Sequence, residues 1–311
     1  MERIVTAIRL PENVTSSLGA IGAVVGPDDW HAHLPGAAAL IATITARVNR
    51  EVLDRADSLR IVANAAVGYD NIDLAECERR GIVVTNTPDV LTDATADLTI
   101  ALLLATVRGL SRAERSLRAG EFRSWSFWNY LEGDVGGATL GVYGLGRIGR
   151  AVARRALAFN MRIQYHGRHH VSPDEERELG ATWVDWDTLV TTSDILTLHA
   201  PYSQATHHVV DAAVLQRMKP GSYLINTARG ALVDEAALVE ALRKGPLAGA
   251  GLDVYEHEPE VHTGLLELPN VTLLPHVGSA TPRTRGAMVG LAARNVWSVL
   301  SGREPITPVR R

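Results

Sequence analysis

Residues 139–149 read TLGVYGLGRIG, an apolar run that leads into three glycines with the spacing GxGxxG. The run Leu140–Tyr143 predicts a β-strand, and residues Arg150–Phe159 predict the helix that follows. A lone GxGxxG is weak evidence, because glycine is common in loops, but a strand before it and a helix after it form the turn that a dinucleotide phosphate needs. The stretch therefore predicts an α/β fold with a nucleotide-binding sheet, and the alternative is an ordinary glycine-rich turn.

Each glycine of this motif has its own physical task. Gly144 allows the tight turn, Gly146 lets the backbone approach a pyrophosphate, and Gly149 allows close packing of the helix. The phosphates would then meet unpaired N–H groups at the positive end of the helix. The candidate cofactor-binding residues of the turn are Gly144, Leu145, Gly146, Arg147, Ile148 and Gly149.

Strands and helices alternate on both sides of the motif, as is typical of parallel sheets with crossover helices. The helical run Asp73–Arg80 ends at Gly81, a plausible C-cap. The strands expected before the motif are Ile4–Ile8, Ala23–Gly26, Leu40–Thr45, Leu59–Ala63 and Ile82–Thr85. The strands expected from the motif onward are Leu140–Tyr143, Arg162–Tyr165, Ile195–Leu198, Tyr223–Asn226, Gly249–Leu252 and Val271–Leu274.

Two longer helices connect the halves of the chain. One helix from Thr92 or Asp93 to about Ala119 would lead from a first domain into a second. The last helix, Thr284–Leu300, has no strand after it and would return to the first domain. We therefore expect two domains, residues 1–92 with 284–311 for the substrate and residues 93–283 for the dinucleotide.

Composition excludes several classes of protein. The 311 residues are 46% hydrophobic and 21% charged, with a formal net charge of -4, which favours a globular protein and offers no basic surface for nucleic acid or an anionic membrane. Cys77 is the only cysteine, so no intramolecular disulfide can form. The start, Met1–Leu10, lacks the features of a signal peptide, and the apolar run Leu98–Val107 is too short to span a membrane. We expect a cytoplasmic protein in which that run is a buried helix.

The end of the strand after the motif predicts the choice of dinucleotide. An NAD-specific site usually places an acidic residue about 20 residues beyond the motif, where this chain has Gly167. Arg168 follows, and its planar guanidinium can bind a 2′-phosphate, so we expect NADP to be preferred and NAD to be possible. The alternative is a solvated basic loop. A metal site is not expected, because His169 and His170 are adjacent and lack the usual spacing of ligands.

Three polar segments follow predicted strands in the second half of the chain. Residues 226–230 read NTARG, residues 251–259 read GLDVYEHEP, and residues 274–280 read LPHVGSA. In open α/β sheets, ligands bind at the carboxyl ends of the strands. The three segments could therefore reach one site.

Together with the glycine motif and with segments 67–73 (VGYDNID) and 87–93 (TPDVLTD), these segments resemble the D-isomer-specific 2-hydroxyacid dehydrogenases. The resemblance covers nearly the whole chain. The stretches Thr87–Arg112 and Gly141–Ala156 and the Gly167–Arg168 pair are most similar to glyoxylate and hydroxypyruvate reductases, and next to 2-ketogluconate reductases. The resemblance implies two doubly wound domains, a flavodoxin-like substrate domain and a Rossmann NAD(P)-binding domain, with an active-site cleft between them.

The resemblance also implies roles for individual residues. Arg229 would bind the substrate carboxylate and polarise the keto group, His276 would donate a proton, and Glu258 would be the partner of His276. Backbone N–H groups of Val67 and Gly68 would hold the carboxylate from the other domain. The cofactor contacts implied outside the glycine motif are Arg168, His199, Pro201, Thr227, Ala228, Arg229, Asp253, His276 and Gly278.

Elementary chemistry independently favours these roles. Delivery of hydride to a ketone builds negative charge on its oxygen, which needs a proton source such as a histidine nearby. The carboxylate of Glu258 beside His276 would favour the charged form of the histidine. Arg229 keeps its charge under all ordinary conditions, which suits a carboxylate anchor.

Each of these residues also has an ordinary structural interpretation. An isolated His or Arg is usually a surface or structural residue, and Glu258 could belong to an acidic loop with Glu256 and Glu260. Asp253 resembles the family's contact with the nicotinamide carboxamide, but a buried turn aspartate is a fair competitor. His199 resembles a residue that lines the cofactor rather than a second catalytic base.

The segment Phe122–Tyr130 contains several aromatic residues between the two halves of the chain. Left in water, these rings would expose a large apolar area. The family resemblance suggests a homodimer in which the segment packs on the partner and contributes to its substrate pocket, and packing in the chain's own core is the alternative.

Two other functions compete with the reduction of a small 2-keto acid. A sugar-acid 2-ketoreductase would act better on 2-ketogluconate than on glyoxylate. A dinucleotide-sensing binding protein could have the same fold without turnover, since fold and site do not prove activity.

Overall fold

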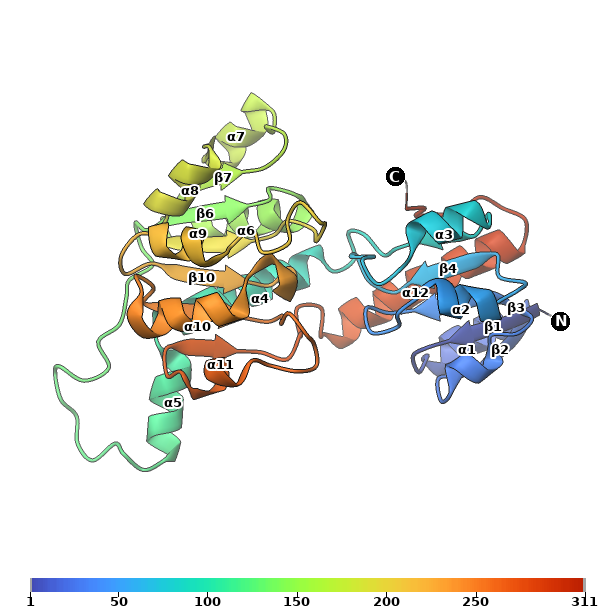
Figure 1. Cartoon of the computed structure of the whole chain (residues 1–311), viewed down its shortest axis with the longest axis horizontal. Coiled ribbons are helices and arrows are strands. Elements are labelled where there is room, and N and C mark those ends of the chain that lie inside the picture. The colour runs from blue at the N-terminus through green and yellow to red at the C-terminus, as the bar shows by residue number, and fades with distance from the viewer. Residues whose placement is uncertain (1, 310–311) are drawn as a thin grey trace. The chain divides into compact units, whose positions relative to one another are not determined.

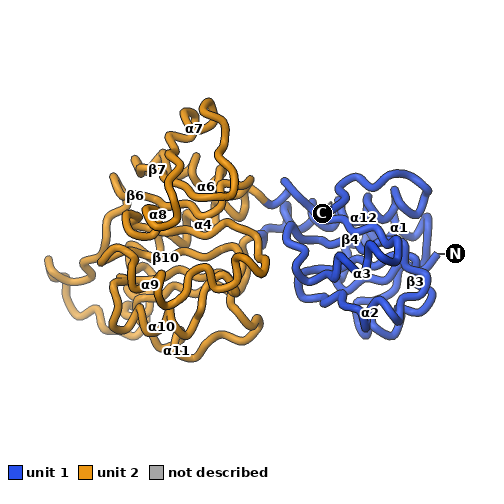
Figure 2. Tube along the Cα trace, turned by 45° about the horizontal axis from the view of Figure 1, so that its top comes forward, with its two compact units in different colours: residues 1–91, 279–311 blue, residues 92–278 orange. Residues whose placement is uncertain are grey.

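The computed structural model describes residues 2–309 and divides into two compact units, coloured separately in Figure 2. Unit 1 comprises Met1–Leu91 and Ser279–Arg311, and unit 2 comprises Thr92–Gly278. The expected domains ended at residue 92 and resumed at residue 284, so the first unit ends one residue earlier and resumes five residues earlier than expected. The last helix belongs to the first unit.

Unit 1 is a parallel five-stranded sheet with the order β2-β1-β3-β4-β5, the flavodoxin-like order that was expected. Every strand expected in this unit is present, with ends shifted by up to three residues. The strands are β1 (Glu2–Thr6), β2 (Gly22–Val25), β3 (Ala37–Ala42), β4 (Ile61–Asn64) and β5 (Val83–Thr85). The helices are α1 (Glu12–Gly19), η1 (Trp30–His33), α2 (Arg50–Arg55), α3 (Leu74–Arg79) and α12 (Pro282–Leu300).

The central strand of unit 1 explains the sheet. All six residues of β3, AAALIA, are buried, and a continuous apolar run of this kind is typical of a strand covered on both faces. Helix α12 covers one face with Ala292, Ala293 and Val296. It begins at Pro282, two residues before the expected start, because the side chain of Thr281 caps the helix and proline fits its first turn.

Unit 2 is a seven-stranded parallel sheet with the order β12-β11-β10-β9-β6-β7-β8. Read from β8, this is the doubly wound Rossmann order with one added edge strand. Figure 1 labels β6, β7 and β10 of this sheet. The strands are β6 (Thr139–Tyr143), β7 (Arg162–His166), β8 (Ala181–Trp183), β9 (Ile195–Leu198), β10 (Tyr223–Asn226), β11 (Gly249–Leu252) and β12 (Val271–Leu273). The expectation of six strands was wrong, because β8 has only three residues and gives no periodic signal.

Helices of unit 2 flank this sheet. They are α4 (Thr92–Val107), α5 (Leu110–Arg118), α6 (Arg147–Leu157), α7 (Pro173–Leu179), α8 (Trp186–Thr192), α9 (Ala212–Arg217), η2 (Gly230–Leu232), α10 (Glu235–Lys244) and α11 (Thr263–Glu267). As expected, the apolar run Leu98–Val107 lies within a core helix, where Leu102, Leu103 and Val107 are buried.

The prediction of one helix from residue 92 to about residue 119 was wrong. The chain breaks into α4 and α5, which are bent by 66°, at Gly109 with a φ of 56°. A Cβ at Gly109 would lie 2.3 Å from Oε1 of Glu132, so the break brings a later segment against the helix end. Among the residues that the structure describes, no single helix is long and apolar enough to cross a membrane, and only this bent pair meets that test, by length and composition alone.

The aromatic segment belongs to the extended loop that connects α5 to β6 (Figure 1). Trp125, Phe127 and Trp128 are 75%, 66% and 74% exposed. The alternative that these rings pack in the core of the chain was therefore wrong.

Candidate active site

The glycine turn after β6 has the form that a dinucleotide phosphate requires. Gly144 has a φ of 96°, and a Cβ there would lie 2.7 Å from the backbone N of Ala200. A Cβ at Gly149 would lie 2.3 Å from the carbonyl oxygen of Gly144, so this glycine lets the helix pack against the strand end. At Gly146, by contrast, a Cβ would meet no described heavy atom within 4 Å besides its chain neighbours. This open space is where a pyrophosphate can approach the backbone, so the residues fit a dinucleotide.

Helix α6 begins inside the motif. Its first residue is Arg147, three residues before the expected Arg150, because the last part of the motif forms the first helical turn. Gly146 is the N-cap and has no side chain to bond the first-turn amides. Those N–H groups and the helix dipole are therefore directed at the open space.

The loop after β7 carries the candidate 2′-phosphate residue. Arg168 is exposed, and its charge acts on the neighbouring strand end: burial raises the pKa of Tyr143, while Arg168 opposes the rise. His170 stacks on Trp183 with ring centroids 4.3 Å apart, which holds the far end of the loop. A positive side chain thus lies at the carboxyl end of the strand beside the glycine turn.

The loop after β9 begins with His199. Its Nε2 lies 2.9 Å from Oγ1 of Thr197, and burial lowers the pKa of His199 to about 3, although part of the residue reaches the surface. A histidine with this pKa is neutral at neutral pH and is a poor proton donor there. A lining role for His199 and the following Pro201 stays a prediction, and the pKa argues against a second catalytic base.

Glu258 and His276 form a hydrogen-bonded pair. Nδ1 of His276 lies 2.8 Å from Oε2 of Glu258, and the two side chains are 28% and 30% exposed. The other carboxylate oxygen, Oε1, accepts a bond of 3.0 Å from the backbone N–H of Tyr255. Burial raises the pKa of Glu258, but the bonds from His276 and Tyr255 and the nearby charge of Arg229 lower it, and the net shift is downward. Glu258 is therefore ionised at neutral pH and fixes the orientation of the imidazole ring.

The loop that carries His276 is tied to Asp253. His276 has a φ of 53°, in the left-handed region, and its N–H donates to the carbonyl of Asp253 at 2.8 Å. The Asp253 carboxylate accepts from the N–H groups of Val277 at 2.7 Å and Gly278 at 2.8 Å. Burial raises the pKa of Asp253, and these amide bonds oppose the rise. These contacts are those of a buried aspartate that fixes a turn. A contact of Asp253 with the nicotinamide stays a prediction.

Arg229 lies in the loop after β10. Asn226 shapes this loop: its Nδ2 donates to the carbonyl of Arg229 at 2.8 Å, and its Oδ1 accepts from the N–H of Ala228 at 3.0 Å. The hydroxyl of Thr227 lies 2.8 Å from that of Thr99 and ties the loop to α4. Because the Arg229 charge lowers the pKa of Glu258, the structure brings Arg229 close to the Glu258–His276 pair.

Gly230 joins the Arg229 loop to the Glu258 turn. A Cβ at Gly230 would lie 1.8 Å from the carbonyl carbon of Tyr255, so the two backbones are in direct contact. The hydroxyl of Tyr255 donates to the carbonyl of Leu274 at 2.8 Å, near the His276 loop. All three segments that the sequence singled out in this unit are thus packed together.

Val67 and Gly68 lie in unit 1, in the loop after β4. Their carbonyl oxygens accept bonds from side-chain amides, from Asn86 to Val67 at 2.8 Å and from Asn64 to Gly68 at 2.7 Å. The loop is therefore fixed by asparagines at the ends of two neighbouring strands. Binding of a carboxylate by its N–H groups stays a prediction.

A second histidine–carboxylate pair, His208 and Glu256, was not predicted from the sequence. Nε2 of His208 lies 2.6 Å from Oε1 of Glu256. The sequence assigns Glu256 only to an acidic loop, and the separation of 48 positions between the partners leaves no local signal. Only the parallel sheet, which puts the loops after β9 and β11 together at the carboxyl ends of the strands, could have suggested the pair.

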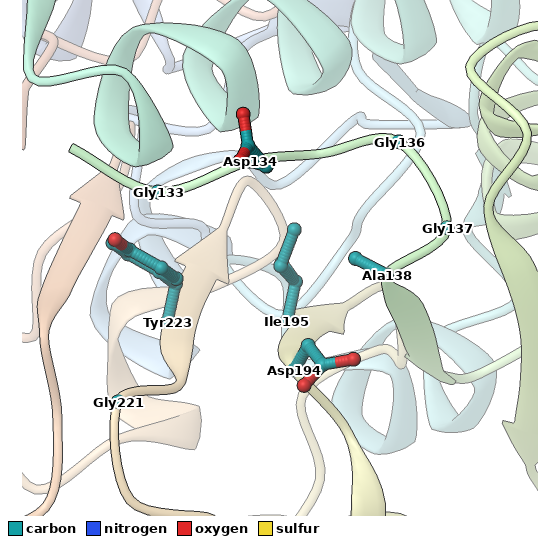
Figure 3. Close-up of a pocket in the computed structure, with 9 residues that line it drawn as sticks. All are labelled: Gly133, Asp134, Gly136, Gly137, Ala138, Asp194, Ile195, Gly221 and Tyr223. Carbon is teal, nitrogen blue, oxygen red and sulfur yellow. The ribbon is translucent and has the colours of Figure 1, made fainter.

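A pocket of about 350 Å³ lies at the amino ends of the strands of this sheet (Figure 3). Its lining includes Asp194, Ile195 and Tyr223, at the amino ends of β9 and β10. The Asp194 carboxylate already accepts from the N–H of Thr139 at 2.8 Å and from Lys219 at 2.5 Å. Since ligands of such sheets bind at the carboxyl ends, this pocket is not the candidate site.

Comparison with known proteins gives the family context of this geometry. Residues 100–278 match the model of the D-isomer specific 2-hydroxyacid dehydrogenase NAD binding domain. A glyoxylate reductase from Thermococcus litoralis is 47% identical over 271 residues, which cover 86% of this chain and 82% of that protein.

Solved structures are similar along the whole chain. A protein from Thermus thermophilus has a TM-score of 0.91 and 43% identity, with 99% of this chain and 100% of that chain covered. An NADPH-dependent glyoxylate/hydroxypyruvate reductase from Sinorhizobium meliloti, in complex with NADP and malonate, has a TM-score of 0.89 and 40% identity, with 100% and 99% covered.

The contrast between Gly146 and Gly149 can be tested by alanine substitution. Gly146→Ala fills the open space and should weaken dinucleotide binding at least tenfold, while the cost in unfolding free energy stays at about 1 kcal/mol or less. Gly149→Ala forces a Cβ against backbone and should cost about 1–3 kcal/mol in the unliganded protein. Fluorescence titration with NADPH and denaturant unfolding measure the two effects. Equal losses of stability in both variants would contradict the assignment.

Proposed function

The chain belongs to the D-isomer-specific 2-hydroxyacid dehydrogenase family of oxidoreductases, and from this premise we propose that it reduces a small 2-keto acid, glyoxylate or hydroxypyruvate, to the 2-hydroxy acid. The observation that carries the proposal is the hydrogen-bonded pair Glu258–His276 beside Arg229. The pair and a glycine turn that fits a nicotinamide dinucleotide both lie at the carboxyl ends of the parallel strands. Acid, anion anchor and cofactor turn are the three elements that the reduction of a keto acid needs.

The reaction assigns a separate task to each of the three side chains. The guanidinium of Arg229 binds the substrate carboxylate and draws electron density from the keto oxygen. When bound, the reduced nicotinamide supplies the hydride to the carbonyl carbon. The N–H of His276 gives its proton to the carbonyl oxygen as negative charge develops there, which completes the alcohol. The ionised Glu258 stabilises the positive charge on the ring before the transfer and holds its orientation.

We further propose that NADPH is preferred to NADH. Residues 166–171 read HGRHHV, so the loop after β7 presents a cation and no carboxylate to the ribose. A guanidinium binds a phosphate through charge-assisted hydrogen bonds, whereas a carboxylate at the same place would repel it. The name of the S. meliloti relative, which is NADPH-dependent, supports the same assignment.

The names of similar proteins support the substrate class. The T. litoralis protein is a glyoxylate reductase, and the S. meliloti protein is a glyoxylate/hydroxypyruvate reductase. The backbone N–H groups of Val67 and Gly68 are proposed to hold the substrate carboxylate. Better turnover of 2-ketogluconate would favour a sugar-acid reductase, and tight cofactor binding without any turnover would favour a dinucleotide sensor.

We also propose that two copies of the chain associate through the aromatic segment. Trp125, Phe127 and Trp128 pack on one another edge to face, with ring centroids 6.2 Å and 4.9 Å apart, yet remain largely exposed. Large exposed aromatic clusters mark interaction sites, and aromatic residues are enriched in the cores of interfaces. A homodimer would cover them.

Substitution of the acid–base pair tests the reaction. His276→Gln should lower kcat/KM for glyoxylate about 10²- to 10⁴-fold, because the proton donor is lost. Glu258→Gln should lower it by a smaller factor, since the imidazole stays in place but loses the carboxylate that stabilises its positive charge. NADPH oxidation measures both, with Glu267→Gln as a matched control on an exposed residue. Wild-type rates in the His276 variant would rule the mechanism out.

The cofactor preference is tested separately at Arg168. Arg168→Ala should lower kcat/KM for NADPH about 10- to 100-fold, because a charge-assisted contact with the 2′-phosphate is removed, and should leave the value for NADH within about twofold. His169→Ala in the same loop is the control. Equal losses with both dinucleotides would place Arg168 outside the 2′-phosphate site.

Association is tested by mass in solution. The wild-type chain should have twice its 33.5 kDa mass, and the double variant Trp125→Ser with Trp128→Ser should shift toward the monomer because apolar contact area is lost. Light scattering after size-exclusion chromatography gives the mass, and Leu266→Ser changes another exposed apolar residue as a control. A monomeric wild type, or a stable dimer of the double variant, would refute this interface.

A further inference from the structure

A second histidine–carboxylate pair lies beside the proposed acid–base pair and has no task in the reaction as described. Nε2 of His208 and Oε1 of Glu256 are 2.6 Å apart, and their side chains are 30% and 17% exposed. His208 belongs to the loop after β9, which begins with the cofactor-lining candidate His199. Glu256 belongs to the loop after β11 and stands two residues before Glu258. The pair therefore joins the two loops by a single side-chain contact.

The turn that carries Glu258 is held on its other side by a buried carboxylate. The N–H of Glu256 donates to Oε1 of Glu235 at 2.8 Å, and Glu235, the first residue of α10, is only 6% exposed. The preceding N–H, that of Tyr255, donates to Glu258 itself at 3.0 Å. Successive backbone groups thus fix the turn and aim the Glu258 carboxylate. The His208 ring bonds the side chain of Glu256, the same residue whose N–H is held by Glu235.

The backbone of His208 is fixed independently of its ring. Its φ is 48°, and its N–H donates to the carbonyl of Ala231 at 2.9 Å, next to the Arg229 loop. The left-handed conformation is unfavourable for most non-glycine residues and is adopted more easily by glycine or asparagine. The imidazole ring adds two contacts at this position, the one with Glu256 and stacking on His207 with ring centroids 4.0 Å apart.

We propose that His208 and Glu256 are positioning residues, which hold the Glu258 turn in the geometry that aligns the His276 ring for proton transfer. The inference rests on the proposed function, and it adds residues that touch neither substrate nor cofactor in that scheme. A displacement of a catalytic group by about 1 Å can cost up to about 10²-fold in rate. Loss of the contact should therefore act on the chemical step and leave the binding of the dinucleotide nearly unchanged.

Kinetics at saturating dinucleotide test this assignment. His208→Asn keeps a residue that tolerates the left-handed backbone but is too short to reach Glu256, and Glu256→Ala removes the other partner. Each should lower kcat roughly tenfold, raise the solvent deuterium isotope effect on kcat, and leave the Kd for NADPH within about twofold. The double variant should be no slower than the slower single variant, because both changes break one contact.

Two matched variants serve as controls. Glu256→Gln keeps an oxygen that accepts from the His208 ring and should retain most of the wild-type kcat. Glu260→Ala removes a carboxylate from the same loop and should behave as wild type. An unchanged isotope effect in His208→Asn, or losses that multiply in the double variant, would show a merely structural role and overturn the proposal.

A measurement on the unliganded protein separates this proposal from the choice of substrate. The ¹⁵N signals of the His276 ring, assigned by their loss in His276→Gln, report the hydrogen bond between Nδ1 and Glu258. They should move in His208→Asn and Glu256→Ala and stay in place in Glu256→Gln. Unchanged signals in the first two variants would refute the positioning role, even if the wild-type enzyme reduces glyoxylate. Absence of turnover by wild type with any 2-keto acid would instead refute the proposed function and leave this test intact.

Discussion

The register of the parallel sheet in unit 2 is the constraint on which the candidate site depends. Tyr143 of β6 and Asn226 of β10 both pair with Leu198 of β9, and Asn226 also pairs with Leu252 of β11. The carboxyl ends of four neighbouring strands are therefore in register. The next residue of each strand begins a loop, and the four loops lie side by side. A register slip of one residue would turn every buried side chain of a strand to the opposite face, so the packed core holds the loops in place.

Backbone contacts between the loops at these strand ends determine how the loops meet. Gly230 touches the backbone of Tyr255, and Asp253 accepts both N–H groups that follow His276. These contacts lie beneath the reactive side chains and use glycine or a short carboxylate, which bring backbones close together. The reactive groups themselves, Glu258 and His276, stay partly exposed. Pre-organised sites share this combination of a rigidly held backbone and accessible reactive side chains.

Much of this arrangement could be predicted from the sequence, because it rests on order along the chain. The motif at Gly144–Gly149 follows a strand, and Arg229, Glu258 and His276 each follow another strand, so the sheet order alone gathers them. Features that depend on one residue in three dimensions escaped prediction. The break at Gly109 depends on Glu132 from a distant loop, β8 is too short for a periodic signal, and the contact of His208 with Glu256 spans 48 residues. Long-range contacts of this kind leave no trace in local periodicity.

The first turn of α6 has a consequence for the stability of unit 2. Gly146, the N-cap, has no side chain that could accept from the first-turn N–H groups, and Arg150 of this turn pairs with Glu175. An anionic dinucleotide would bond these N–H groups at the positive end of the helix dipole. A ligand that binds only the folded state stabilises it by about 2.7 kcal/mol at a hundred times its Kd. Bound dinucleotide would therefore stabilise the folded state of unit 2 as well as take part in the reaction.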